Sequence, residues 1–411
     1  FAAMRRWHAI LAALLAVLLL AGCGPTRKEL RRSIAIAEAR APTALTCERA
    51  GGCAIESPLQ ELADRAFAAS SADTPRHYVR LLEGGQHALL ARIHLIRSAR
   101  RSIDLQSFIF AEDDSGYFIV NELLQAARRG VRVRVLLDQL YSFEDVELLA
   151  WLAQAHANFD MRLYNPTFGE ARTGPLQFAA GVICCFFRFN QRMHNKLLLV
   201  DGRIGVTGGR NYQNRYFDWD AEFNYRDRDV LLAGPGAGEM QASFDTFWAH
   251  ALSVPVAGLR DVAPLLLDPA YQPQPASPEL TRLDRIREIS RQSDDAALVQ
   301  RELAADALAV GRVDYISDLP GKPNERAGPA ADTGQYLRGL LEGAEHEIVL
   351  QTPYLVLSRN AKRLFRTLHE RPQPPRVIVS SNSLASTDAF PVYALSHKYK
   401  RSYLREYGFT I

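Results

Sequence analysis

From Gln86 onward, hydrophobic positions alternate between helical and extended spacing. Leu89, Ile93 and Ile96 recur at helical intervals, and a continuous apolar run typical of a buried strand follows. The same succession then repeats, with valines alternating with arginines in the second strand. Alternating helices and strands of this kind predict a layered α/β fold. The expected elements are a helix from Gln86, a strand at 102–110, a helix at 116–129, a strand at 131–137, a helix at 147–155 and a strand at 161–164.

A second region of the same type follows a proline-rich break around residues 269–278 and a charged helical segment at 279–292. It has strand patterns at 347–356 and 376–380, separated by a helix at 361–369. The spacing of 32 residues from Gln106 to Asp138 is close to the 31 from Gln351 to Asn382. This favours an internal repeat. The alternative is that any two α/β units share such a period.

The N-terminal residues have the pattern of an export signal. Arg5 and Arg6 precede an apolar run, 9–22, that is shorter than the roughly 20 residues needed to cross a bilayer as a helix. An uncleaved signal anchor is the alternative. The end of this run, Leu-Ala-Gly-Cys, resembles a bacterial lipobox, which implies cleavage before Cys23 and acylation of its sulfur. We therefore expect export to the bacterial cell envelope and anchoring to a membrane by lipidated Cys23.

Composition adds two restrictions. The chain has 411 residues, of which 47% are hydrophobic, so it can form more than one packed domain. Its net charge of +3 provides no basic field of the kind that nucleic-acid binding uses. Cys47 and Cys53 flank a Gly-Gly turn, and a disulfide between them is plausible, although spacing alone does not fix it. The adjacent Cys184 and Cys185 lie in an apolar stretch, and we interpret them as buried packing residues.

His194 and Lys196 are the sharpest chemical feature of the sequence. The apolar, β-rich stretch 193–200 predicts a strand, and residues two apart on a strand point to one face. The two side chains should therefore converge on one ligand. A neutral imidazole can attack phosphorus and form a phosphohistidine, while the ammonium offsets phosphate charge. This chemistry implies no metal and no cofactor.

The surrounding residues complete a recognisable pattern. Asp201 begins a predicted hairpin turn, and Gly208, Gly209 and Asn211 follow it. The glycines would allow backbone amides and Asn211 to approach an oxyanion. This HxKxxxxD pattern with its glycine extension resembles the phospholipase D superfamily, and residues 216–229 resemble its cardiolipin synthase C group. The resemblance implies that His194 is the nucleophile or its partner acid, that Lys196 and Asn211 bind phosphate, and that Asp201 orients the catalytic segment.

The resemblance also implies a second such motif, and the 411 residues contain only one. His397 is followed by a lysine but lacks the spacing and the aspartate, so we interpret 397–400 as the basic face of a helix. Applying the repeat spacing to Asn382 places the second motif beyond Ile411. We therefore expect a fragment that lacks the acid histidine and is inactive as a monomer.

The expected fold is α/β, with two similar α-β-α sandwich halves that have mixed sheets, the second half being incomplete. The expected divisions are a lipoprotein signal peptide at 1–23, an N-terminal extension at 24–75, a first phospholipase D-like domain at 76–255, a linker at 256–300 and a second, truncated domain at 301–411.

The implied function is a phosphatidyltransferase that makes cardiolipin from phosphatidylglycerol and a second phospholipid, such as phosphatidylethanolamine. We expect a membrane surface as partner and no nucleic acid; the sequence does not indicate an oligomeric state. The alternatives are an exported phospholipase or nuclease that uses water as acceptor, and a noncatalytic lipoprotein of the same fold. The apolar run 178–189 is interpreted as a buried core element, or alternatively as a segment that dips into the lipid surface.

Overall fold

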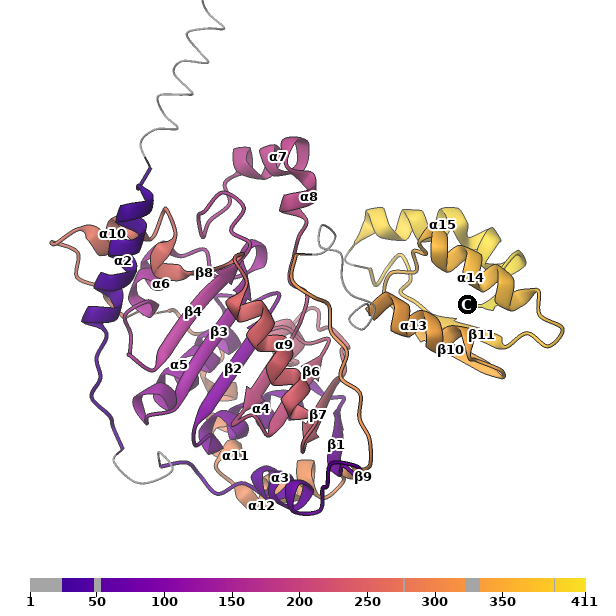
Figure 1. Ribbon diagram of the computed structural model, residues 1–411, viewed down its shortest axis with the longest axis horizontal. Helices are drawn as coiled ribbons and strands as arrows, with labels where there is room; N and C mark the ends of the chain where they lie inside the picture. Colours follow the sequence, from indigo (N-terminus) through magenta and orange to yellow (C-terminus); the bar gives the residue numbers. More distant parts are fainter. Residues whose placement is uncertain (1–23, 48–52, 276–277, 322–332, 388) are drawn as a thin grey trace, which may run out of the picture. The chain divides into compact units, whose positions relative to one another are not determined.

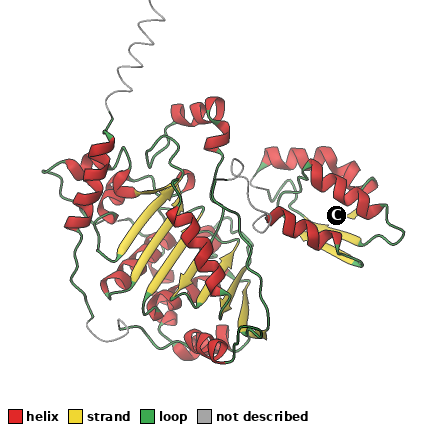
Figure 2. Cartoon of the chain, viewed as in Figure 1, coloured by secondary structure: helices red, strands yellow, loops and turns green. Residues whose placement is uncertain are grey.

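Strands rich in Val, Leu and Ile form one large mixed sheet in the first part of the chain (Figures 1 and 2). The computed structural model describes residues 24–47, 53–275, 278–321, 333–387 and 389–411. They divide into two compact units, Phe1–Arg326 and Ala327–Ile411. The predicted signal peptide, with Cys23, lies outside the described residues.

The sheet of the first unit has the order β8-β4-β3-β2-β5-β6-β7-β1-β9. Within it β2, β3 and β4 are parallel, whereas β5, β6 and β7 run antiparallel to their neighbours. The strands are β1 His77–Leu82, β2 Ser102–Ser107, β3 Arg132–Asp138, β4 Phe159–Tyr164, β5 Leu197–Val200, β6 Ile204–Gly208, β7 Asp229–Ala233, β8 Ser253–Pro255 and β9 Leu308–Val310.

Helices cover both faces of this sheet, which explains why its central strands are apolar on both sides. Strand β5 shows this directly, since Leu198 and Val200 join one hydrophobic cluster and Leu197 and Leu199 the other. The helix α9 packs on the second face, and the remaining core helices pack on the first. The main helices of the first unit are α2 Arg27–Arg40, α3 Pro58–Ala68, α4 Gly85–Ser98, α5 Asp114–Arg128, α6 Val146–Leu152, α9 Ala237–Ala249, α10 Ala263–Leu267, α11 Leu283–Ser293 and α12 Ala296–Val299.

The division between the units differs from the predicted one. The expected linker, 256–300, contains α10, α11 and α12, and its Leu259, Leu266 and Ile289 are buried in the first unit's core. Strand β9 then pairs with β1 in the same sheet. The prolines and charges that suggested a linker therefore belong to surface turns and to the solvent side of amphipathic helices, and the first unit extends to Arg326.

The second unit repeats the opening of the first. Its order is α13 Thr333–Glu342, β10 Glu347–Gln351, α14 Arg359–His369, β11 Arg376–Ser380, α15 Phe390–Arg405 and β12 Phe409–Thr410. The three strands are parallel in the order β10-β11-β12, as β2, β3 and β4 are in the first unit. The repeat predicted from the strand spacing is thus present in the described residues.

Two helices interpreted as core elements are instead largely exposed. These are α7 Pro175–Cys184 and α8 Phe186–Phe189, which carry exposed apolar side chains. The interpretation of Cys184 and Cys185 as buried packing residues is wrong, because Cys184 is exposed and the two are joined by a disulfide. Cys47 and Cys53 also form a disulfide. Within the described ranges, the structure has no helix with the length and apolar character that a membrane span requires.

Candidate active site

The functional residues gather at one end of the large sheet. The parallel strands β2, β3 and β4 end there, and β5 begins there because it runs antiparallel to β2. His194 and Lys196 precede β5, which begins only at Leu197, so the predicted strand 193–200 is too long at its start. The site therefore lies at the carboxyl ends of the parallel strands, where α/β sheets generally hold their ligands.

The segment before His194 is held by a buried carboxylate at the end of β3. Asp138 accepts hydrogen bonds from the Met193 backbone N–H at 2.8 Å and from the Arg192 guanidinium at 3.1 Å. Gln106 on β2 also donates to the Met193 sulfur. Burial raises the pKa of Asp138 to about 6, although the Arg192 charge acts in the opposite direction. Asp138 is therefore a positioning residue for the segment that carries His194.

The His194 imidazole is exposed on the surface of the unit and contacts the ring of Phe108, whose centroid is 4.6 Å away. Partial burial lowers the pKa of His194 to about 4, the Lys196 ammonium contributes to the lowering, and Asp318 opposes it. The imidazole is consequently neutral at pH 7. A neutral ring nitrogen has the free electron pair that attack on phosphorus requires.

Lys196 is buried beside His194. Its ammonium donates to the His194 carbonyl at 2.8 Å and lies 5.4 Å from the centre of the Phe108 ring. Burial lowers the pKa of Lys196 to about 8, while Asp227, Asp229 and Asp138 oppose the change. The side chain is thus largely cationic at pH 7, in surroundings that strengthen its interaction with an anion.

Asp201 lies at the opposite end of β5, away from the imidazole. Its carboxylate accepts from the backbone N–H groups of Arg100, Arg101 and Ser102, at the start of β2. Asp201 and Gly202 both have positive φ and form the tight turn between β5 and β6 that the sequence predicted. Asp201 therefore fixes the β5–β6 hairpin to β2 and does not contact the reacting groups.

The glycine pair and Asn211 are engaged with the protein itself. The Gly209 N–H donates to the Arg228 carbonyl, and a Cβ at Gly209 would lie 2.1 Å from an oxygen of Asp227. The Asn211 amide accepts from the Ile109 N–H and donates to the Tyr216 hydroxyl. Gly208 and Gly209 allow the chain just before β7 to lie close against their own backbone. Asn211 positions the loop after β2.

A buried ion cluster supports the same region. Asp229 is fully buried and accepts from Arg92 on α4 at 3.0 Å and from Arg210 at 3.3 Å. Burial raises the pKa of the neighbouring Asp227. The cluster joins the start of β7, the end of β6 and α4 behind the sheet.

Sequence reasoning missed three residues around His194. Phe108 follows β2 and Asp138 ends β3, so strand ends at the site could have indicated both. Asp318 comes from the segment after β9, more than a hundred residues from the motif. Two hydrogen bonds hold that segment against the first unit. The Tyr315 backbone N–H donates to α9, and the Gly321 backbone N–H donates to the Tyr164 hydroxyl. No local pattern in the sequence indicates that the segment after β9 lies near the His194 segment.

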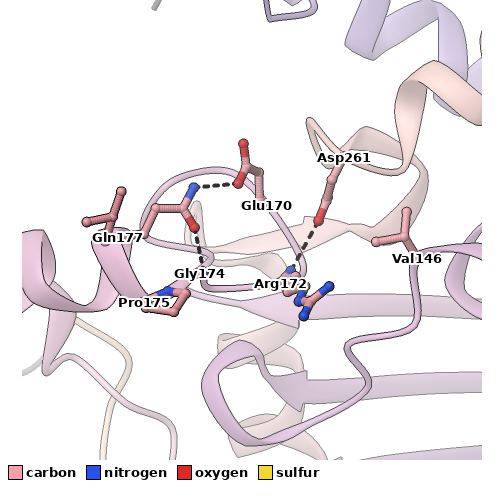
Figure 3. Close-up of a pocket in the computed structure, with 8 residues that line it drawn as sticks. Val146, Glu170, Arg172, Gly174, Pro175, Gln177 and Asp261 are labelled. Atoms are coloured by element: carbon pink, nitrogen blue, oxygen red, sulfur yellow. Dashed lines mark hydrogen bonds between the residues drawn. The ribbon is translucent and has the colours of Figure 1, made fainter. Parts of the chain in front are cut away.

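A separate pocket of about 440 Å³ lies at the start of α7 (Figure 3). Neither His194 nor Lys196 lines it. Its lining residues are Val146, Glu170, Arg172, Gly174, Pro175, Leu176, Gln177 and Asp261.

Residues 92–248 match the family model described as cardiolipin synthase, PLD-like domain. The chain is 30% identical over 355 residues to an uncharacterized protein of Helicobacter pylori (strain J99), covering 82% of this chain and 66% of that protein. It is 29% identical over 341 residues to cardiolipin synthase C of Escherichia coli (strain K12), covering 80% and 67%. The chain thus spans about two thirds of the length of these relatives.

Among solved structures, the chain is similar to phosphatidylserine synthase of Haemophilus influenzae Rd KW20. The TM-score is 0.47 at 16% sequence identity, over 85% of this chain and 72% of that protein.

Proposed function

The chain belongs to the phospholipase D superfamily, and on that basis we propose that it carries the nucleophile of a phosphatidyltransferase that forms cardiolipin. The observation that carries the proposal is the pairing of a neutral, accessible His194 imidazole with a buried cationic Lys196. One group supplies the electron pair and the other binds the phosphate oxygens.

In the proposed reaction, a ring nitrogen of His194 attacks the phosphorus of a phospholipid. The N–P bond forms as the P–O bond to the headgroup alcohol breaks, and a general acid protonates the leaving oxygen. Lys196 stabilises the charge that develops on the nonbridging oxygens. The hydroxyl of phosphatidylglycerol then gives its proton to the conjugate base of the general acid and attacks the phosphohistidine. The new P–O bond forms as the N–P bond breaks, which releases cardiolipin and regenerates the imidazole. The family resemblance assigns the acid to the histidine of a second motif, which is not among these 411 residues.

The proposed phosphatidyl donor is phosphatidylglycerol or phosphatidylethanolamine, and phosphatidylglycerol is the proposed acceptor. Support comes from the cardiolipin synthase description of the matched family model and from the similarity to cardiolipin synthase C. The net charge of +3 gives no electrostatic preference for nucleic acid.

The test is conversion of labelled phosphatidylglycerol, with and without phosphatidylethanolamine. It uses these 411 residues alone and the same chain joined to a segment that carries a second HxKxxxxD motif, which we call the extended version. Cardiolipin from the extended version supports transfer. Phosphatidic acid alone would show hydrolysis and contradict transfer, and no product from either version would contradict the enzymatic proposal.

A matched pair of variants assigns the nucleophile. His194→Gln in the extended version should abolish both the acid-labile phosphohistidine and the product, with an unchanged melting temperature because the side chain is exposed. His87→Gln, at a half-exposed histidine on α4, is the control and should retain both. Turnover by His194→Gln equal to that of the control would refute the role of His194.

A further inference from the structure

The helices α7 and α8 present apolar side chains to solvent. We call residues Pro175–Phe189 the apolar knob. Leu176 is 87% exposed, Ile183 84% and Phe187 70%. Figure 1 shows α7 and α8 projecting from the end of the unit, beyond the strands. Exposed apolar groups gathered in this way usually mark an interaction surface.

The knob is a formed structure with a fixed base, which distinguishes it from a loose loop. Phe189 is buried and packs edge-on against Phe178, and a Cβ at Gly181 would collide with the Phe189 ring. At the start of α7, the Gly174 N–H donates to the Gln177 side chain, which in turn donates to Glu170 (Figure 3).

The end of the knob is fixed to β4. The Asn165 side chain, directly after that strand, donates to the Arg188 carbonyl at 2.7 Å and to the Gln191 carbonyl at 3.0 Å. The exposed apolar side chains are therefore held on a base that is attached at both ends.

The charges around the knob favour an anionic surface. Residues 173–187 contain no charged side chain, and no aspartate or glutamate occurs from 171 to 200. Arg172 and Arg188 are exposed at the two ends of the uncharged stretch. An apolar tip with basic residues at its borders matches the order of layers at a lipid surface, where anionic headgroups lie outside the acyl chains.

Two neighbours place such a surface beside the catalytic segment. His194 follows the knob by five residues, and Arg192 and Met193 between them are fixed by Asp138. Gly24, the first described residue after the proposed lipidation site, lies against Arg260, whose N–H donates to the Gly169 carbonyl in the loop that leads to α7. An acyl anchor at this point would attach to the same edge of the unit.

We propose that the apolar knob inserts into the surface of an anionic phospholipid bilayer and places the His194 segment at the headgroups. The choice of a lipid surface over a protein partner rests in part on the proposed function. Insertion would transfer the exposed Leu, Ile and Phe side chains into the acyl region, with Arg172 and Arg188 at the phosphates.

The experiment measures flotation of the full chain, with Cys23→Ser to remove any acyl anchor, on vesicles of phosphatidylglycerol and of phosphatidylcholine. Burying one such side chain changes partitioning by about tenfold. The double variant Ile183→Ser and Phe187→Ser should therefore weaken binding to phosphatidylglycerol vesicles by about a hundredfold. Leu308→Ser on β9, which removes a comparably exposed side chain outside the knob, should leave binding unchanged.

Phe187→Trp provides a direct measure of depth, with Leu308→Trp as its control. Brominated lipids should quench the tryptophan at 187 and not the one at 308. Equal vesicle binding by the double serine variant and its parent would overturn the proposal. So would a dimer in solution that the double variant dissociates, if the parent does not bind vesicles.

These outcomes separate this inference from the proposed function. If vesicle binding depends on the knob but no version transfers phosphatidyl groups, the membrane-insertion proposal stands and the proposed phosphatidyltransferase function is refuted. The double variant can also be made in the extended version. If it no longer converts bilayer lipid but still converts dispersed short-chain lipid, the insertion proposal and the proposed function are both supported. Unchanged binding refutes the docking whatever the turnover.

Discussion

Replacing Asp201 tests whether the aspartate of the motif stabilises the fold. Its carboxylate accepts from three consecutive backbone N–H groups at the start of β2. Each net hydrogen bond contributes about 0.5–1.5 kcal/mol, and since these amides are partly accessible to water, we take about 2 kcal/mol in total. Alanine at a φ of 55° adds about 1 kcal/mol. Asp201→Ala should therefore lower the free energy of unfolding by about 3 kcal/mol.

Asp201→Asn is the graded control. Asparagine tolerates positive φ and keeps one accepting oxygen, so its cost should be about 1 kcal/mol. The assay is urea unfolding followed by tryptophan fluorescence, which reports on the first unit because every tryptophan precedes residue 327. A cost below about 1 kcal/mol for Asp201→Ala, or equal costs for both variants, would refute the hydrogen-bond assignment.

Further predictions concern the neighbouring residues. In the extended version, activity should fall above about pH 8 as Lys196 loses its proton, and below about pH 4 as His194 gains one; Lys196→Arg should remove the alkaline fall, and an unchanged pH profile would contradict its role. Gly209→Ala should destabilise the first unit by about 1–3 kcal/mol because the new methyl group meets Asp227, and unaltered urea unfolding would show that the chain before β7 moves away. Asp138→Ala should reduce kcat more than it raises KM, because the segment before His194 loses its anchor while the imidazole remains; unchanged kcat would exclude positioning by Asp138.

Much of the fold follows from local patterns. Alternating helical and extended spacing predicted α4, β2, α5, β3, α6 and β4 in the first unit and β10, α14 and β11 in the second. The boundary between the two units was not predictable in this way. A charged helix has the same composition whether it links two domains or packs on one of them through one buried side. The helix α11 does the latter, with Ile289 buried in the core of the first unit.

The site was predictable where its residues are close in sequence and not where the fold brings them together. His194 and Lys196 were proposed from their spacing, and their catalytic role stays a prediction. Asn211 was expected at an anion, which stays a prediction; in the structure its amide joins the Ile109 backbone to the Tyr216 hydroxyl. Asp318, which acts electrostatically to raise the pKa of His194, lies far from the motif in sequence. Composition also placed α7 in the core, because hydrophobicity alone does not distinguish a buried helix from an exposed apolar one.

The burial of Asp229 between Arg92 and Arg210 restricts how this family member can change. Losing Asp229 leaves two arginine charges in the interior without their carboxylate, and breaking a buried ion pair in this way typically costs about 3–5 kcal/mol, whereas apolar replacement of a whole buried ion cluster of similar volume is often tolerated. A homologue that lacks the aspartate should therefore also have replaced both arginines, whereas a homologue that lacks one arginine can keep the remaining ion pair.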